Sequence, residues 1–175
     1  MGTVWVSGVC DPYQPLEAKY KITRQCLEIL VRNNWPVFIQ TRSSLVVRDM
    51  DIFKQSDHID VGLSITTAND KIRKIFEPCA PPVEKRLSAI ETLHQNGIRT
   101  YVMIAPILPE AENLIALLAG KVDYIIIDRM NYSHADKIYE RHGWKDKNTC
   151  DYFRLIGNKI EKDCAELGIE CRSAY

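Results

Sequence analysis

The chain has 175 residues, of which 46% are hydrophobic and 26% charged, and its 23 basic residues equal its 23 acidic ones. This composition is typical of one globular domain with a substantial core, and the balanced charge gives no support to nucleic acid or an anionic membrane as a partner. No apolar run reaches the ~18 residues of a membrane span, and the start lacks the features of a signal peptide. We therefore expect a cytoplasmic protein.

Short apolar segments rich in β-branched residues alternate with amphipathic segments along most of the chain. The predicted strands are 3–9, 37–41, 61–65, 100–105 and 122–127. Helical periodicity predicts helices at 17–34, 45–55, 69–76, 83–96, 111–119, 133–142 and 150–167. The first of these helices has an apolar stripe formed by Ile22, Cys26, Ile29 and Leu30. The last segment, 169–175, is either a short strand or a tail.

The alternation of buried strands with helices, without hairpin signals, predicts parallel βα units. Right-handed crossovers wind such units into an open doubly wound sheet or a barrel. Five predicted units are too few to close a barrel of about eight. We expect an α/β fold in a single domain, 1–175, and the pattern leaves a partial barrel or an open sheet as its two possible forms.

Polar residues gather after the predicted strands, at the ends that carry the chemistry of parallel α/β folds. In chain order they are Cys10, Asp11, Arg42, Ser43, Ser64, Thr66, Ala105-Pro106 with Glu110 beyond, Asp128 and Arg129. Together these residues would place cations, carboxylates and hydroxyls around one opening of the fold. Such an opening is suited to a small polar or zwitterionic ligand. For Arg42, a ligand role is favoured over pairing with a neighbouring carboxylate, because its loop is small and hydroxylic.

Several of these residues also have a structural interpretation. Asp11 can cap the turn that follows it, and Ser43 can be the N-cap of the next helix. Asp128 and Arg129 can form a local ion pair. Ser64 lies in the alternating pattern of a strand, and from the residues alone we interpret it as structural.

The cysteine spacing gives little support to a metal site. The chain contains neither CxxC nor CxxxCxxC, and its six cysteines are Cys10, Cys26, Cys79, Cys150, Cys164 and Cys171. A zinc or iron–sulfur site made from these residues alone is therefore not expected. Without a secretion signal, reduced thiols are the default.

Four strings occur in an order and spacing that resembles the spore photoproduct lyase-like branch of the radical S-adenosylmethionine (radical SAM) superfamily, often labelled "DNA repair photolyase". They are VSGVCDPYQPLEAKY, QTRSSLVVRDMDIF, VGLSITTANDKIRKIFEPCAPPVEKRLSAI and GIRTYVMIAPILP, and the resemblance covers roughly residues 4–128. It implies a partial TIM-like (βα) barrel of about six βα units, about five of them in this chain at 3–128, followed by a C-terminal helical extension at 129–175. It also implies a CxxxCxxC-bound 4Fe-4S cluster and S-adenosylmethionine (SAM), which the cluster cleaves to methionine and a 5′-deoxyadenosyl radical.

The resemblance implies roles for individual residues. Cys10-Asp11 stands where the family has Thr or Ser before Asp-Pro, beside the amino-acid end of SAM. Arg42 stands at a position where Lys is common, and its guanidinium is expected to pair with the SAM carboxylate. Ser64 matches a serine that contacts SAM. The predicted cofactor-binding residues are Cys10, Asp11, Arg42, Ser43, Ser64, Thr66, Ala105 and Pro106, with further substrate or cofactor contacts at Glu77, Asp128 and Arg129.

The chain departs from the family pattern in two ways. The cluster motif is absent, so we expect it in a missing N-terminal segment or a cysteine-bearing partner chain, and we expect this chain alone to be inactive and to hold no cluster. Gly8 stands where spore photoproduct lyase has a hydrogen-donating cysteine, which argues against thymine-dimer repair by that route. The first strand is expected to expose an edge that a partner, a swapped segment or a second copy in a homodimer covers.

Two other functions stay open. A barrel segment without a cluster can act as a non-catalytic interaction module that docks through its open edge. An ordinary α/β enzyme can bind phosphate or carboxylate at Arg42 and Ser43, although the chain has no Gly-rich phosphate loop. The substrate is not encoded in any of these patterns.

Overall fold

The computed structural model describes residues 2–6, 8–131 and 133–174. Its centre is a six-stranded sheet in which neighbouring strands are parallel and follow the order of the chain. The strands are β1 (Val4–Val6), β2 (Val37–Thr41), β3 (Ile59–Ser64), β4 (Arg99–Ile104), β5 (Tyr124–Ile127) and β6 (Glu170–Ser173). The predicted partial barrel of parallel βα units is confirmed, and the C-terminal segment forms a strand rather than a tail.

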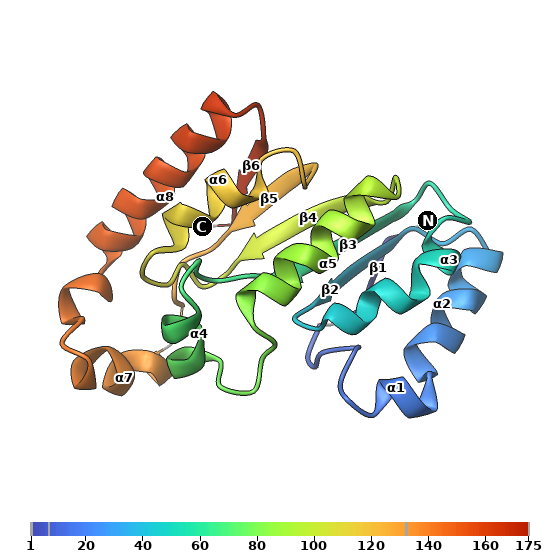
Figure 1. Cartoon of the computed structure of the whole chain (residues 1–175), viewed down its shortest axis with the longest axis horizontal. Coiled ribbons are helices and arrows are strands. Elements are labelled where there is room, and N and C mark those ends of the chain that lie inside the picture. The colour runs from blue at the N-terminus through green and yellow to red at the C-terminus, as the bar shows by residue number, and fades with distance from the viewer. Residues whose placement is uncertain (1, 7, 132, 175) are drawn as a thin grey trace.

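Helices connect the strands and lie together on one face of the sheet (Figure 1), as right-handed crossovers between successive neighbours require. They are α1 (Glu17–Tyr20), α2 (Ile22–Arg32), α3 (Met50–Phe53), α4 (Asp70–Phe76), α5 (Val83–Gln95), α6 (Leu114–Leu118), α7 (Asp136–Arg141) and α8 (Cys150–Glu166). Short 3-10 turns are η1 (Ser44–Asp49), η2 (Ala111–Asn113), η3 (Ser133–Ala135) and η4 (Lys145–Lys147). None of the described helices has the length and apolar character to cross a membrane.

The hydrophobic core lies between the sheet and these helices. Alternate residues of each strand face it, since side chains along a strand point to opposite faces. The buried strand residues include Val37, Ile39, Val61, Leu63, Val102, Ile104, Ile125 and Ile127, and they pack against Leu27, Ile52, Phe53, Ile90, Leu93 and Leu114.

The opposite face of the sheet carries a row of stacked rings. The Phe38 and Tyr101 ring centroids are 4.5 Å apart, and those of Tyr101 and Tyr124 are 5.2 Å apart. The Tyr101 ring lies across Gly62, where a Cβ would overlap it, and its hydroxyl donates to the main-chain oxygen of Ile39 at 2.9 Å. These rings come from the N-terminal halves of their strands, so they fill that end of the face.

The N-terminal region differs from the prediction. The first strand is Val4–Val6 rather than 3–9, and within that range residue 7 lies outside the described residues. The single helix predicted at 17–34 is two helices, because Lys21 adopts φ 54° between them. The Glu17 carboxylate accepts from the main-chain nitrogens of Thr23 and Arg24 at 3.1 and 3.4 Å. These hydrogen bonds cap the first turn of α2.

The apolar stripe predicted on this helix was wrong in its orientation. Of its four residues, Leu30 packs against the core, but Ile22, Cys26 and Ile29 are exposed. The neighbouring face with Leu27 and Val31 is the one buried in the core. Helix α2 therefore has apolar residues on two faces, of which the sheet covers one. The helix predicted at 45–55 is also shorter, with η1 followed by one turn of α3.

Candidate functional site

The predicted residues after β2 and β3 lie side by side at the C-terminal end of the sheet. Thr41 is in register with Leu63, so Arg42 and Ser64 follow at neighbouring positions. Ser64 is buried, and its Oγ accepts from Gln40 Nε2 at 3.1 Å. Cys10, in the loop after β1, is exposed.

Asp11 fastens the loop after β1 to the end of β2. Its Oδ1 accepts from Thr41 Oγ1 at 2.6 Å and from the main-chain nitrogen of Tyr13 at 2.8 Å. Its Oδ2 accepts from the main-chain nitrogen of Arg42 at 2.7 Å. Both carboxylate oxygens are engaged by the protein's own donors, so Asp11 shapes the mouth by capping, as its structural interpretation anticipates.

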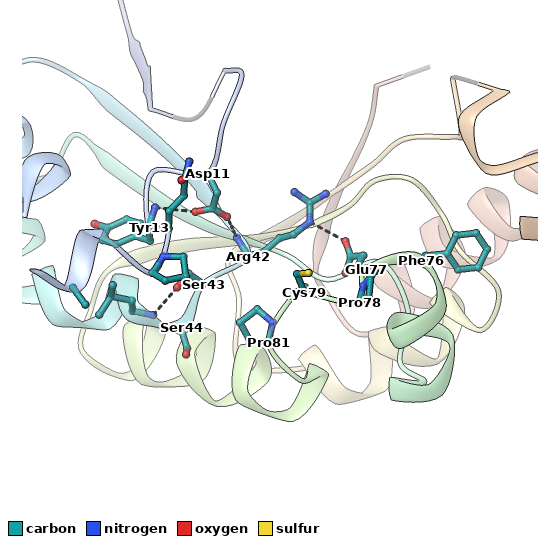
Figure 2. Close-up of a pocket in the computed structure, with 15 residues that line it drawn as sticks. Asp11, Tyr13, Arg42, Ser43, Ser44, Phe76, Glu77, Pro78, Cys79 and Pro81 are labelled. Carbon is teal, nitrogen blue, oxygen red and sulfur yellow. Dashed lines mark hydrogen bonds and ion pairs between the residues drawn. The ribbon is translucent and has the colours of Figure 1, made fainter. Parts of the chain in front are cut away.

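Arg42 forms an ion pair through one edge of its guanidinium. Its Nε donates to Glu77 Oε1 at 2.8 Å, and its side chain is 46% exposed. Within the described residues, Nη1 and Nη2 have no hydrogen-bond partner, and Figure 2 shows them pointing away from Glu77. This free edge has the geometry to bind a carboxylate or phosphate with two hydrogen bonds.

Glu77 is shared between two arginines. Its Oε2 accepts from Arg86 Nη1 at 3.0 Å, and the same Nη1 donates to the main-chain oxygen of Ser64 at 2.7 Å. Arg86 comes from α5 and is fully buried. Burial lowers the pKa of Arg86, and the negative charge of Glu77 opposes that effect.

The loop between α4 and α5 is clamped by a third arginine. Arg73 donates from Nη1 to the main-chain oxygens of Glu77 and Ala80 at 3.2 and 2.9 Å. Its Nε donates to Asp70 at 3.0 Å, and this hydrogen bond helps lower the Asp70 pKa to about 2. The loop that carries Glu77 is therefore fixed at both ends.

Two cavities meet at the Arg42–Glu77 pair. The larger, of about 790 Å³, lies between the loop after β1 and the loop that carries Glu77 (Figure 2). Its other lining residues include Asp11, Tyr13, Ser43, Leu45, Phe76, Cys79 and Pro81. The smaller, of about 270 Å³, is lined also by Phe76, Pro106, Leu108, Met130 and His134. Of the predicted residues, Asp11 and Ser43 line the larger cavity, Pro106 lines the smaller, and Arg42 and Glu77 line both. The predicted residues that line neither are Cys10, Ser64, Thr66, Ala105, Asp128 and Arg129.

The other predicted residues are placed as follows. Ser43 is the N-cap of η1, and its Oγ accepts from the main-chain nitrogen of Leu45 at 3.3 Å. Thr66 is buried, and its Oγ1 has no partner within the described residues. Ala105-Pro106 is a cis peptide. Asp128 accepts from the main-chain nitrogen of Arg129 at 2.8 Å and from Asn131 Nδ2, and Arg129 lines a separate small cavity.

A second buried network behind the larger cavity was not foreseen from the sequence. Asp49 is fully buried and accepts from Tyr13 at 3.1 Å, Arg24 at 3.0 Å and Arg48 at 2.8 Å. Burial raises the pKa of Asp49, but the hydrogen bonds from Arg48 and Arg24 outweigh it and leave that pKa below its usual value. Because Tyr13 lines the larger cavity, this network fixes one of its walls.

The cysteines of this chain do not fit a 4Fe-4S cluster. Among residues 2–6, 8–131 and 133–174, no three His, Cys, Asp or Glu side chains are grouped to hold a metal. Cys10, Cys26, Cys79 and Cys150 are exposed, and Cys164 packs with Cys171 between α8 and β6. The free edge of Arg42, in contrast, can bind a carboxylate or a phosphate.

Comparison with known proteins links this chain to a family. Residues 2–118 match the family model described as "Radical SAM superfamily". The chain is 32% identical over 158 residues to an uncharacterized protein of Methanocaldococcus jannaschii, covering 90% of this chain and 61% of that protein. It is 28% identical over 105 residues to a radical SAM Nalpha-GlyT isomerase of Pseudomonas phage M6, covering 60% of this chain and 22% of the isomerase.

A solved structure shares the fold. Spore photoproduct lyase complexed with dinucleoside spore photoproduct matches with a TM-score of 0.70 at 12% identity, and the match covers 98% of this chain and 60% of the lyase. At this identity the likeness shows the fold alone. The chain spans about three-fifths of the length of the archaeal relative and of the lyase.

Proposed function

Because the chain belongs to the radical SAM superfamily, we propose that it is the C-terminal, SAM-binding part of a radical SAM enzyme whose 4Fe-4S cluster is held by residues outside it. The observation that carries this proposal is the free guanidinium edge of Arg42 at the mouth of the sheet. In such enzymes the bound cluster supplies the electron that cleaves SAM to methionine and a 5′-deoxyadenosyl radical.

The residues of this chain would bind and orient SAM. Arg42 would hold its carboxylate through Nη1 and Nη2. Asp11 would fix the shape of this part of the site, because it fastens the loop after β1 to the end of β2. Ser64 and the Ala105-Pro106 turn lie at the ends of β3 and β4, where we propose that the adenosine part contacts the protein. Apolar walls such as Phe76 limit the access of water to the bound ligand.

The edge of β1 is the place where we propose that the cluster-bearing segment or partner chain docks. Within the described residues, β1 pairs only with β2. Trp5 is 56% exposed, and the outer face of α2 adds Ile22 at 63% and Ile29 at 59%. An open strand edge beside exposed apolar side chains is unfavourable in isolation and favours association. A second copy of this chain is the competing occupant.

Binding of S-adenosylhomocysteine to the full chain tests the proposed cofactor site. Titration calorimetry should show binding that weakens about tenfold in Arg42→Met, because a charge-assisted pair with the carboxylate is lost. Arg154→Met, an exposed arginine of α8, is the control and should bind like the unchanged chain. Equal affinity of the unchanged chain and Arg42→Met would refute the assignment of Arg42.

A non-catalytic interaction module is the second candidate, and the exposed apolar edge is the observation that favours it. The two candidates separate in one comparison. An interaction module would associate through β1 and α2, and light scattering should show that Ile29→Asp abolishes this association. It would bind no SAM analogue. Anaerobic reconstitution with iron and sulfide should leave the isolated chain without a stoichiometric cluster under either candidate.

A further inference from the structure

The Arg42–Glu77 pair is not neutral, because a second cation shares the carboxylate. Glu77 uses Oε1 for Arg42 and Oε2 for Arg86, at 2.8 and 3.0 Å. Two positive charges therefore face one negative charge, and the group of three carries a net charge of +1. An exposed salt bridge between Arg42 and Glu77 alone would be neutral and would attract an anion only weakly.

The position of Arg86 connects the two predicted ligand-binding segments. It lies in the first turns of α5, is fully buried, and contacts the Glu77 carboxylate and the main-chain oxygen of Ser64 through one nitrogen. An apolar side chain of similar size usually stabilises a core at least as well as a buried ion pair. Stability alone therefore gives little reason for a charged residue here.

We propose that Arg86 is a positioning residue that acts on Arg42 through Glu77. It occupies one oxygen of Glu77, holds the other toward Arg42 Nε, and keeps net positive charge at the outer edge of Arg42. Its bond to Ser64 fixes the end of β3 relative to that charge. The ligand class it serves is a carboxylate, and this rests on the proposed function in assigning that carboxylate to the amino-acid part of SAM.

A pair of small probes measures the carboxylate preference of the site directly. Benzoate and its neutral analogue benzamide have the same ring, which suits the apolar walls beside Arg42. NMR titrations that follow the Arg42 Nε–H signal of the folded chain should give roughly tenfold tighter binding of benzoate than of benzamide. In Arg86→Met the two affinities should become equal, because Glu77 then neutralises Arg42.

Arg73→Met is the matched control. Arg73 is also buried and holds the same loop, but it contacts main-chain oxygens rather than the Glu77 carboxylate. It should keep the benzoate preference. An equal loss in Arg73→Met and Arg86→Met would overturn the proposal, since the role of Arg86 would then be loop stability. If Arg86→Met does not fold, Arg86→Lys decides: a preference above about threefold supports a charge effect, and parity contradicts it.

The probes also separate this proposal from the proposed function. If benzoate preference depends on Arg86 while the chain binds no S-adenosylhomocysteine, the positioning role stands and the cofactor assignment fails. If S-adenosylhomocysteine binds through Arg42 and Arg86→Met leaves the benzoate preference unchanged, the cofactor assignment stands and the positioning role is wrong.

Discussion

Two arginine–carboxylate networks border the larger cavity, and they differ in whether their cations are fully occupied. In the network around Asp49, Arg48 uses all three guanidinium nitrogens, bonding Asp49 and Glu17. Arg24 likewise bonds Asp49, Asp51 and Glu28. In the network around Glu77, Arg42 keeps two nitrogens free within the described residues.

The charge of the two networks differs as well. Arg24 and Arg48 face four carboxylates, those of Asp49, Glu17, Asp51 and Glu28, so that network is net negative and its cations are fully paired. The network around Glu77 is net positive and open on its exposed side. The comparison suggests that the first serves to hold the loop after β1 in place, and the second to meet an anionic ligand. Each of the following experiments tests one side of that contrast.

The largest expected effect is on stability, from Asp49→Ala. Removing this carboxylate leaves Arg48 and Arg24 without their shared acceptor in a buried place, which typically costs about 3–5 kcal/mol. Urea unfolding followed by circular dichroism measures the change. Asp51→Ala is the control, because Asp51 is 59% exposed, and a pair of this kind contributes about 0–1 kcal/mol. Equal losses in the two variants would show that the Asp49 network is not a closed structural unit.

Acid should weaken the same network. The pKa values of Asp49 and Glu17 lie below their ordinary values of 3.8 and 4.5, since hydrogen bonds from Arg48 outweigh the opposing effect of burial. A carboxylate with a depressed pKa stabilises the fold above its unfolded pKa and loses this contribution as the pH falls through its folded pKa. The free energy of unfolding should therefore be level above about pH 5 and fall below about pH 4. Asp49→Asn should flatten that fall; an unchanged slope would contradict the assignment.

The smallest expected effect on stability is from Arg42→Met. Arg42 is nearly half exposed, so its pair with Glu77 should contribute no more than about 1 kcal/mol. Its loss should nevertheless abolish the preference for benzoate over benzamide, measured by titration. A large loss of stability with the preference intact would reverse the roles that we assign to the two networks.

The order of elements follows from the sequence with little error, because buried parallel strands and amphipathic helices have distinct periods. The helix break at Lys21 could not be found in this way. It depends on the Glu17 carboxylate capping α2 from six and seven residues away, and a periodic pattern does not record such a contact. Periodicity found one apolar stripe of α2 and missed the neighbouring face with Leu27 and Val31, which is the face that the sheet covers.

For the site, the sequence placed Arg42, Ser43 and Ser64 at strand ends, and the structure has them there; their role as cofactor contacts stays a prediction. It did not identify Arg86. One signal was present, since Arg86 lies on the apolar stripe of α5 between Val83 and Ile90. A charged residue on a buried stripe needs a partner. The sequence does not show that this partner is Glu77, because the two side chains meet only in the folded loop.

The stacked rings of Phe38, Tyr101 and Tyr124 fill the N-terminal half of the sheet's helix-free face, and the Tyr101 ring lies across Gly62. The two cavities at Arg42 and Glu77 are instead lined mainly by loops that follow the strands. Substitutions in those loops can therefore reshape the cavities while the stacked rings stay in place.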